Sequence, residues 1–456
     1  MTAPSKSGAG ESIPAPASNR PVSIPISASN RRSLIPGFRC GVGVPLFLPF
    51  FWFLSAPGIA EGQSALERAL ETPRVRAGVE RLETMTREGA QLLAEIGGIV
   101  SPSGQEHERA ERVAREMRRM GLSQVRVDKS PNAIGVIPGR SGKAMVFVST
   151  LDDLATVAEH QRQAPGPPRV EGDRVVGPGT NTSSITVAML MAAEAYLAAG
   201  LEPEHDLVFA AVAQEETGLV GMHALLEEYR DRALGFVDIL GDGRSISYGA
   251  ISIHWWRVEG EGPPGHSLGG GLPNVNQGLT RAVDRILTWA EEAQDPSQRT
   301  VVNVAMLRSG EVFNHKPASG WFSLDLRSLD GGVVDRMEQE VSAILVAVSE
   351  ETGIPLRMVP GQLTPGGQIP GFRDSELVRT AEGVSRYLGL EPQLGIAGSS
   401  NMNVPLGEGV PAIGLGGSRG GERGSPGEWA DVPAMVRAAK HVFLLAAALG
   451  GQDGHL

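Results

Sequence analysis

The sequence predicts an α/β protein whose mostly parallel sheet, flanked by helices, is interrupted by a smaller α+β domain. Three observations predict this. Strand-like apolar runs alternate with helical periodicities up to about residue 250. A strand–helix–strand–strand–helix order then follows, and the first pattern resumes after the Gly- and Pro-rich segment Pro360–Gly371.

The first part of the large domain begins with helical periodicity over residues 66–98. Ser103 and Glu106 form a capping-box pattern for a second helix, which Gly121 should end in the left-handed conformation. Two strands are expected next, at Gln124–Asp128 and Ala144–Thr150. A helix at Thr186–Ala199 and a buried strand at Leu207–Ala213 continue the alternation that is typical of a parallel sheet.

The inserted segment has the element order of a ferredoxin-like domain. Its expected strands are Ala250–Glu259, Val301–Arg308 and Trp321–Arg327, and its expected helices are Asn276–Ala293 and Val333–Glu351.

The large domain should then resume with a helix at Asp374–Leu388, a strand at Pro411–Leu415 and a helix at Pro433–Leu449. The expected division of the chain is a leader at 1–62, the large domain at 63–250 and 363–456, and the inserted domain at 251–362.

The leader carries the parts of a secretory signal. Arg31, Arg32 and Arg39 precede an apolar run at Gly41–Leu54, and small residues follow as far as Ala60. The run is shorter than the roughly 20 residues that a spanning helix needs. We therefore expect export to the periplasm or the medium, with an uncleaved membrane anchor as the alternative.

Composition excludes some classes of protein. The 456 residues suffice for two domains, and 41% hydrophobic with 20% charged residues is typical of soluble globular chains. The net charge of -11 argues against nucleic acid as a partner.

Candidate catalytic and binding residues follow the predicted strands, where open α/β sheets place their sites. They fall in six segments: Thr150–Asp153, Gly177–Thr182, Glu215–Gly218, Asp242, Gly265–Ser267 and Gly424–Trp429.

In this order, and over about residues 66–450, these segments resemble the co-catalytic zinc peptidases that include peptidase T, carboxypeptidase G, aminoacylase and succinyl-diaminopimelate desuccinylase. The resemblance implies a zinc-peptidase-like fold with a dimerising lid domain, a homodimer, and hydrolysis of small peptides or N-acyl amino acids. In that family two zinc ions activate a shared water and polarise the scissile carbonyl.

Carried over by position, the resemblance makes Glu215 the general base and Glu216 a metal ligand. Asp242 fits a further ligand, and Asp152 fits the carboxylate that orients the first histidine, with metal contact as a weaker role. His266 matches the group that steadies the oxyanion in the partner subunit's site. The candidate substrate contacts are Asn314, Arg327, Asn181 and Thr182.

Three expected metal ligands are replaced. Thr150 and Gly424 stand where histidines belong, and Thr182 stands where the bridging aspartate belongs, with Asn181 one residue away. Asn401 fills a further acidic position. A neutral hydroxyl is a poor zinc ligand, so we expect an altered zinc site, a single magnesium or calcium ion on oxygen ligands, or no metal.

Alternatives remain open for several groups. Glu215 and Glu216 form either a solvated acidic pair or a dry pair whose pKa values separate, as a metal-free hydrolase requires. The run Thr180–Ser184 is either an ordinary N-cap or an anion site. His266 is either an exposed loop residue or catalytic, and His254–Trp256 is either an interface cluster or a ligand contact.

Three functions fit these residues. The first is an amide hydrolase with an altered or lost dizinc site. The second is an inactive homologue that binds a peptide or an amino-acid-like ligand. The third is a structural partner of an active paralogue.

Overall fold

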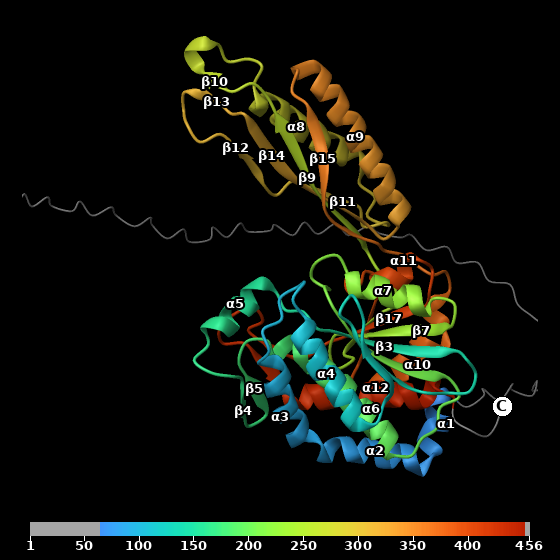
Figure 1. Cartoon of the computed structure of the whole chain (residues 1–456). Helices are drawn as coiled ribbons and strands as arrows, with labels where there is room; N and C mark the ends of the chain where they lie inside the picture. The colour runs from blue at the N-terminus through green and yellow to red at the C-terminus, as the bar shows by residue number, and fades with distance from the viewer. Residues whose placement is uncertain (1–63, 452–456) are drawn as a thin grey trace, which may run out of the picture. The chain divides into compact units, whose positions relative to one another are not determined.

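The computed structural model describes residues 64–451 (Figure 1). The predicted leader and its signal-like segment lie outside the described residues.

Three helices replace the single helix expected over residues 66–98: α1 (Ala65–Glu71), α2 (Pro73–Thr84) and α3 (Thr86–Gly97). The first break follows from Pro73, which disfavours helical dihedrals in the residue before it. Thr72 is accordingly extended, with φ -71° and ψ 117°.

Helix α4 (His107–Met120) ends at Gly121, whose φ of 92° confirms the predicted left-handed cap. The capping box predicted for its start was wrong. The Ser103 hydroxyl donates to Asp152, and the Glu106 carboxylate accepts the backbone N–H groups of Gly104 and Gln214. Tertiary partners therefore take both side chains away from the helix end.

The large sheet has eight strands in the order β1-β2-β6-β3-β7-β17-β8-β16. Its strands are β1 (Ser123–Val127), β2 (Ala133–Ile137), β3 (Ala144–Thr150), β6 (Asp206–Val212), β7 (Ala233–Ile239), β8 (Ser245–Ser247), β16 (Gln393–Gly395) and β17 (Ala412–Gly416). The central strands β6, β3, β7 and β17 pair in parallel, which confirms the predicted sheet type.

Helices pack against this sheet (Figure 1). They are α4, α6 (Thr180–Ala198), α7 (Val220–Tyr229), α10 (Glu376–Tyr387) and α12 (Val432–Leu449). The same domain also contains α5 (Ala155–Gln163) and α11 (Asn403–Gly407). Helix α6 begins six residues before the predicted start, so that Thr180–Ser184 lies inside its first turns. Among the described helices, α12 alone has the length and hydropathy of a membrane span, but 72% of that window is buried, as in a core helix.

A smaller sheet joins β18 (Gly420–Gly421), β19 (Trp429–Asp431), β5 (Arg174–Val176) and β4 (Arg169–Glu171) in that order. It ties the segment around residues 420–431 to the start of α6.

The inserted domain runs from β9 (Ser252–Glu261) to β15 (Leu356–Thr364). Between them lie α8 (Val275–Ala293), β11 (Val301–Asn303), β12 (Leu307–Ser309), β14 (Ser319–Ser328) and α9 (Gly331–Thr352). The antiparallel order β11-β14-β9-β15, with α8 and α9 packed on one face, confirms the ferredoxin-like prediction (Figure 1).

Two details of this domain differ from the sequence-based expectation. The strand predicted at Val301–Arg308 is divided into β11 and β12, which both pair with β14. Strand β15 was not predicted, because Pro360 and Gly361 read as a loop. An edge strand tolerates Pro360, and the register with β9 shifts there, as at a bulge.

Candidate active site

The carboxyl ends of three neighbouring parallel strands bring the predicted residues together. Thr150 ends β3, Glu215 and Glu216 follow β6, and Asp238 lies one residue before the end of β7. Strand β3 pairs with both β6 and β7, so these side chains share one edge of the sheet.

Asp152 holds the turn that carries the two glutamates. Its buried carboxylate accepts the backbone N–H of Glu215 at 2.8 Å and that of Glu216 at 3.0 Å, together with the Ser103 hydroxyl at 2.5 Å. Both oxygens are therefore engaged. Asp152 fits a positioning role better than that of a metal ligand.

Glu215 lies in an electrostatic setting that favours its neutral form. Burial and the nearby carboxylates of Glu216, Asp238 and Asp152 together raise the pKa of its carboxyl to about 8, while Arg423 opposes them. A group with a pKa near the working pH is well matched to proton transfer in both directions.

Two arginines lie among these carboxylates. The Arg423 guanidinium pairs with the Glu216 carboxylate. Burial and Arg423 lower the pKa of Arg419, while the negative charges of Glu215 and Glu216 raise it. We call Glu215, Glu216, Asp238, Arg419 and Arg423 the carboxylate–arginine cluster.

Asp238 was not singled out in the sequence, and its only signal was an acidic residue near the end of an apolar strand. Burial raises the pKa of its carboxyl to about 6, against the Met402 N–H and the Arg419 charge. The Asn401 amide links it to β3, donating to Thr150 Oγ1 at 3.1 Å and to Asp238 Oδ1 at 3.5 Å. At the position where the resemblance expects an acidic residue, Asn401 therefore supplies neutral hydrogen-bond donors.

Asp242, the predicted third metal ligand, is occupied elsewhere. Its fully buried carboxylate accepts Arg437 Nε at 3.1 Å and Arg437 Nη2 at 3.0 Å, and also the Ser418 N–H. Asp238, and not Asp242, is among the three carboxylates named above that raise the pKa of Glu215.

The N-terminus of α6 binds a carboxylate of the same chain. Buried Glu428 accepts the backbone N–H groups of Gly179 at 2.9 Å, Asn181 at 3.0 Å and Gly424 at 3.0 Å. The anion site considered for Thr180–Ser184 is thereby filled internally, as the positive end of a helix favours. Thr182 is buried in the first turn of the helix.

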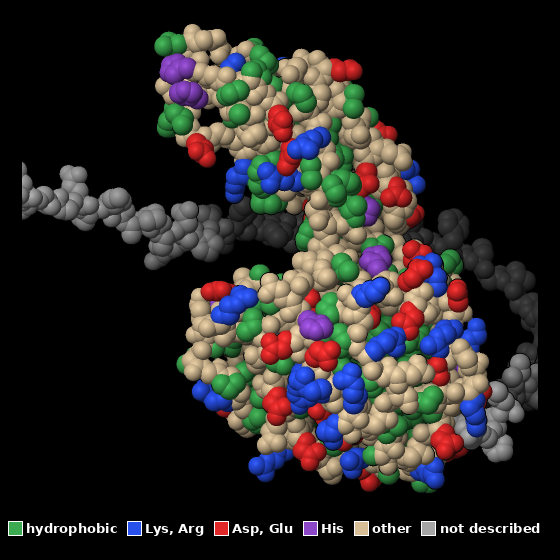
Figure 2. Space-filling model, in the orientation of Figure 1, with side chains coloured by type: hydrophobic (Ala, Val, Ile, Leu, Met, Phe, Trp, Pro, Cys, Tyr) green, Lys and Arg blue, Asp and Glu red, His purple; other side chains and the backbone are tan. Residues whose placement is uncertain are grey.

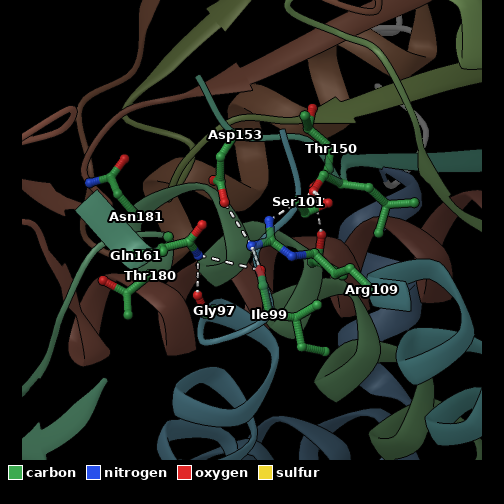
Figure 3. A network of polar contacts seen from close by, with 12 residues as sticks. Gly97, Ile99, Ser101, Arg109, Thr150, Asp153, Gln161, Thr180 and Asn181 are labelled. Carbon is green, nitrogen blue, oxygen red and sulfur yellow. Dashed lines mark hydrogen bonds and ion pairs between the residues drawn. The ribbon is translucent and has the colours of Figure 1, made fainter. Parts of the chain in front are cut away.

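An ion pair lies beneath the end of β3 (Figure 3). Arg109 donates to Asp153 at 2.6 Å and to the carbonyl oxygens of Ile99 and Leu151, and both charged side chains are buried. Burial raises the pKa of Asp153 to about 6, and Arg109 opposes that rise. Nothing in the arginine-rich sequence of α4 distinguishes Arg109 from its neighbours.

His266 and Asn314 meet at the end of the inserted domain. They lie on paired segments, β10 (Gly265–His266) and β13 (His315–Lys316) with the residue before it, and Asn314 Nδ2 lies 2.9 Å from His266 Nε2. Figure 2 shows histidine side chains gathered at this exposed end. Within residues 64–451, neither residue contacts the carboxylate–arginine cluster.

Arg327, the remaining predicted substrate contact, pairs with Asp325 on its own strand β14 at 2.9 Å. The structure therefore gives it a partner within the inserted domain.

Three positions to which the resemblance assigns zinc ligands carry neither an imidazole nor a carboxylate. Thr150 and Thr182 offer only hydroxyls, and Gly424 offers no side chain. Glu216 already pairs with a guanidinium. Neutral hydroxyls are poor zinc ligands.

The model of peptidase family M20/M25/M40 matches residues 152–448. The chain belongs to this peptidase family. This M20 family member is 24% identical over 333 residues to succinyl-diaminopimelate desuccinylase of Corynebacterium glutamicum, covering 71% of this chain and 87% of that one. It is 27% identical over 204 residues to carboxypeptidase G2 of a Pseudomonas species, covering 43% and 47%.

The fold agrees with this membership. The crystal structure of aminopeptidase PepT from Bacillus cereus is similar with a TM-score of 0.65 at 18% identity, covering 80% of this chain and 98% of that one.

Proposed function

We propose that this M20 family member hydrolyses the amide bonds of small peptides or N-acyl amino acids without the dizinc centre of its relatives. The observation that carries the proposal is the position of Arg419 and Arg423. Their positive charges lie among Glu215, Glu216 and Asp238, the region to which the resemblance assigns zinc.

The chemistry needs a base, a positive group and an acid. Glu215 in its ionised form takes a proton from water as the water oxygen attacks the amide carbon, and it returns that proton to the nitrogen as the C–N bond breaks. A guanidinium beside Glu215 is a source of positive charge for the oxygen of the tetrahedral intermediate.

The substrate class is supported by the names of the relatives. They denote removal of a succinyl group and of terminal amino acids. Small amides that carry a carboxylate are therefore the first class to assay.

Binding without turnover is the second candidate, and one observation favours it. The Glu216 carboxylate is held by Arg423, so a single carboxylate, Glu215, is left for proton transfer at the turn after β6. A homologue that only binds an amino-acid-like ligand would not need a second free carboxylate.

A homodimer formed through the inserted domain belongs to the same proposal, because the family resemblance assigns His266 to the site of a partner subunit. Exposed apolar side chains beside it support an interface. Leu268 is 92% exposed and Phe313 is fully exposed. We also propose export, on the basis of the signal-like leader.

The test is a hydrolysis screen after exhaustive chelation. We would assay N-acetyl and N-succinyl amino acids and dipeptides with wild type, Glu215→Gln and the exposed control Glu227→Gln. We expect activity to survive chelation, to fall at least 100-fold in Glu215→Gln, and to persist in Glu227→Gln.

Two other results are informative. Activity that chelation abolishes and zinc restores would refute a metal-independent reaction. Ligand binding by calorimetry, without product in any assay, would favour the second candidate.

A further inference from the structure

A second group of metal-binding side chains lies in the inserted domain. It consists of His254 on β9 and of Asp335 and Glu338 on α9. We propose that these three residues form a site for one divalent transition-metal ion, separate from the carboxylate–arginine cluster.

Strand and helix periodicity place the three side chains together. Along β9, His254, Trp256 and Val258 share one face, and Val258 is fully buried against the helices. Asp335 and Glu338 are three residues apart, so they lie on one side of α9. The fold thus directs an imidazole and two carboxylates to one point.

The distances suit a single ion. One ligand atom from each residue lies within 4.8 Å of the other two. His254 Nδ1 is 2.5 Å from Glu338 Oε1, and Trp256 Nε1 donates to the same oxygen at 2.7 Å. Zinc bonds of about 2.0–2.2 Å to nitrogen and oxygen would require only small side-chain shifts.

The charge of the group is unbalanced without a cation. In the described part of the chain, neither Asp335 nor Glu338 forms an ion pair with lysine or arginine, and the only ionisable partner of Glu338 is His254. The active-site carboxylate Glu216, in contrast, is already paired with Arg423.

The group opens onto space for a further ligand. His254 and Asp335 line a cavity of about 750 Å³, together with the glycines that begin α9 and the segment 365–368. Three protein ligands with an open position are the pattern of sites that bind a water or a small molecule on the metal. One imidazole with two carboxylates suits zinc, manganese or cobalt.

The experiment measures binding of the metal alone to the full chain. Metal-free wild type would be titrated with zinc by calorimetry and with cobalt by visible absorption, and metal content would be counted by elemental mass spectrometry after dialysis. We expect one ion per chain. His254→Ala and Glu338→Gln should each weaken binding by on the order of 100-fold.

Two controls locate the ion. Glu340→Gln removes the same charge from an exposed position of α9 and should bind like wild type. Glu216→Gln should also bind like wild type. Asp335→Asn should weaken metal binding. Because Asp335 is exposed, weaker binding by this variant would not be a result of unfolding.

The proposal is overturned if wild type retains no metal, if His254→Ala binds as tightly as wild type, or if binding is lost in Glu216→Gln. Amide hydrolysis is measured separately, so failure here leaves the proposed reaction untouched.

Discussion

Arg423 donates from its guanidinium to the carboxylate of Glu216, 207 residues earlier in the chain. The family resemblance makes Glu216 a metal ligand, yet in the folded protein its carboxylate pairs with the guanidinium of Arg423. This pairing, with Arg419 beside it, is the basis of the proposal that the protein works without a dizinc centre.

Removing Arg423 should make Glu215 harder to ionise. Arg423 is the charge that lowers the pKa of Glu215, so Arg423→Ala should move that pKa above about 8. The pH at which hydrolysis is half-maximal should rise, and the rate at pH 7 should fall about tenfold. Arg169→Ala, at an exposed arginine, should leave the profile unchanged. If the pH–rate profile does not shift, Arg423 does not influence the ionisation of the reacting carboxylate, and the prediction is wrong.

Glu215 should make stability depend on pH. Its pKa is about 8 in the folded protein and near 4.5 in the unfolded chain, so the folded state holds the proton over that window. The stabilisation is complete below the unfolded value and is lost as pH rises through about 8.

Relative to Glu215→Gln, wild type should therefore lose on the order of 2 kcal/mol between pH 5 and pH 9, allowing for partial exposure. Urea unfolding of both proteins at several pH values measures the difference. Asp153 and Asp238 are present in both proteins, so their contributions to the pH dependence cancel in the difference between the two free energies of unfolding. A constant difference would contradict the prediction.

The ion pair between Arg109 and Asp153 should be important for stability. Arg109→Met leaves the buried Asp153 carboxylate without its cation and removes one of the two side-chain donors to each of the Ile99 and Leu151 carbonyls, which should cost about 3–5 kcal/mol in urea unfolding. The double change Arg109→Met with Asp153→Asn should recover part of this loss. Arg169→Met, in an exposed pair, should cost less than about 0.5 kcal/mol.

Exposed apolar residues near His266 should support self-association. Phe313→Ser with Leu268→Ser removes two highly exposed apolar side chains and should shift sedimentation from dimer toward monomer. Hydrolysis should fall with it, because His266 would no longer reach a partner's site. Val170→Ser, another exposed apolar residue, is the control. A wild type that sediments as a monomer would remove the dimer proposal.

Local patterns predicted much of the fold. Strand β3 matches its predicted bounds, and Gly121 caps α4, because both depend on nearby residues and on backbone geometry. The capping box at Ser103 failed because Asp152, 49 residues away, competes for the hydroxyl. Strand β15 was missed because edge position, which sequence does not reveal, is what tolerates Pro360.

The sequence by itself determined the ligand types at the candidate site: two glutamates after a buried strand, and no imidazole or bridging carboxylate at Thr150, Thr182 or Gly424. Only the tertiary structure decided which charges face them. Arg419 and Arg423 lie beside Glu215 and Glu216 although more than 200 residues separate them in the sequence. Electrostatic energy depends on distance and burial in space, and sequence spacing encodes neither.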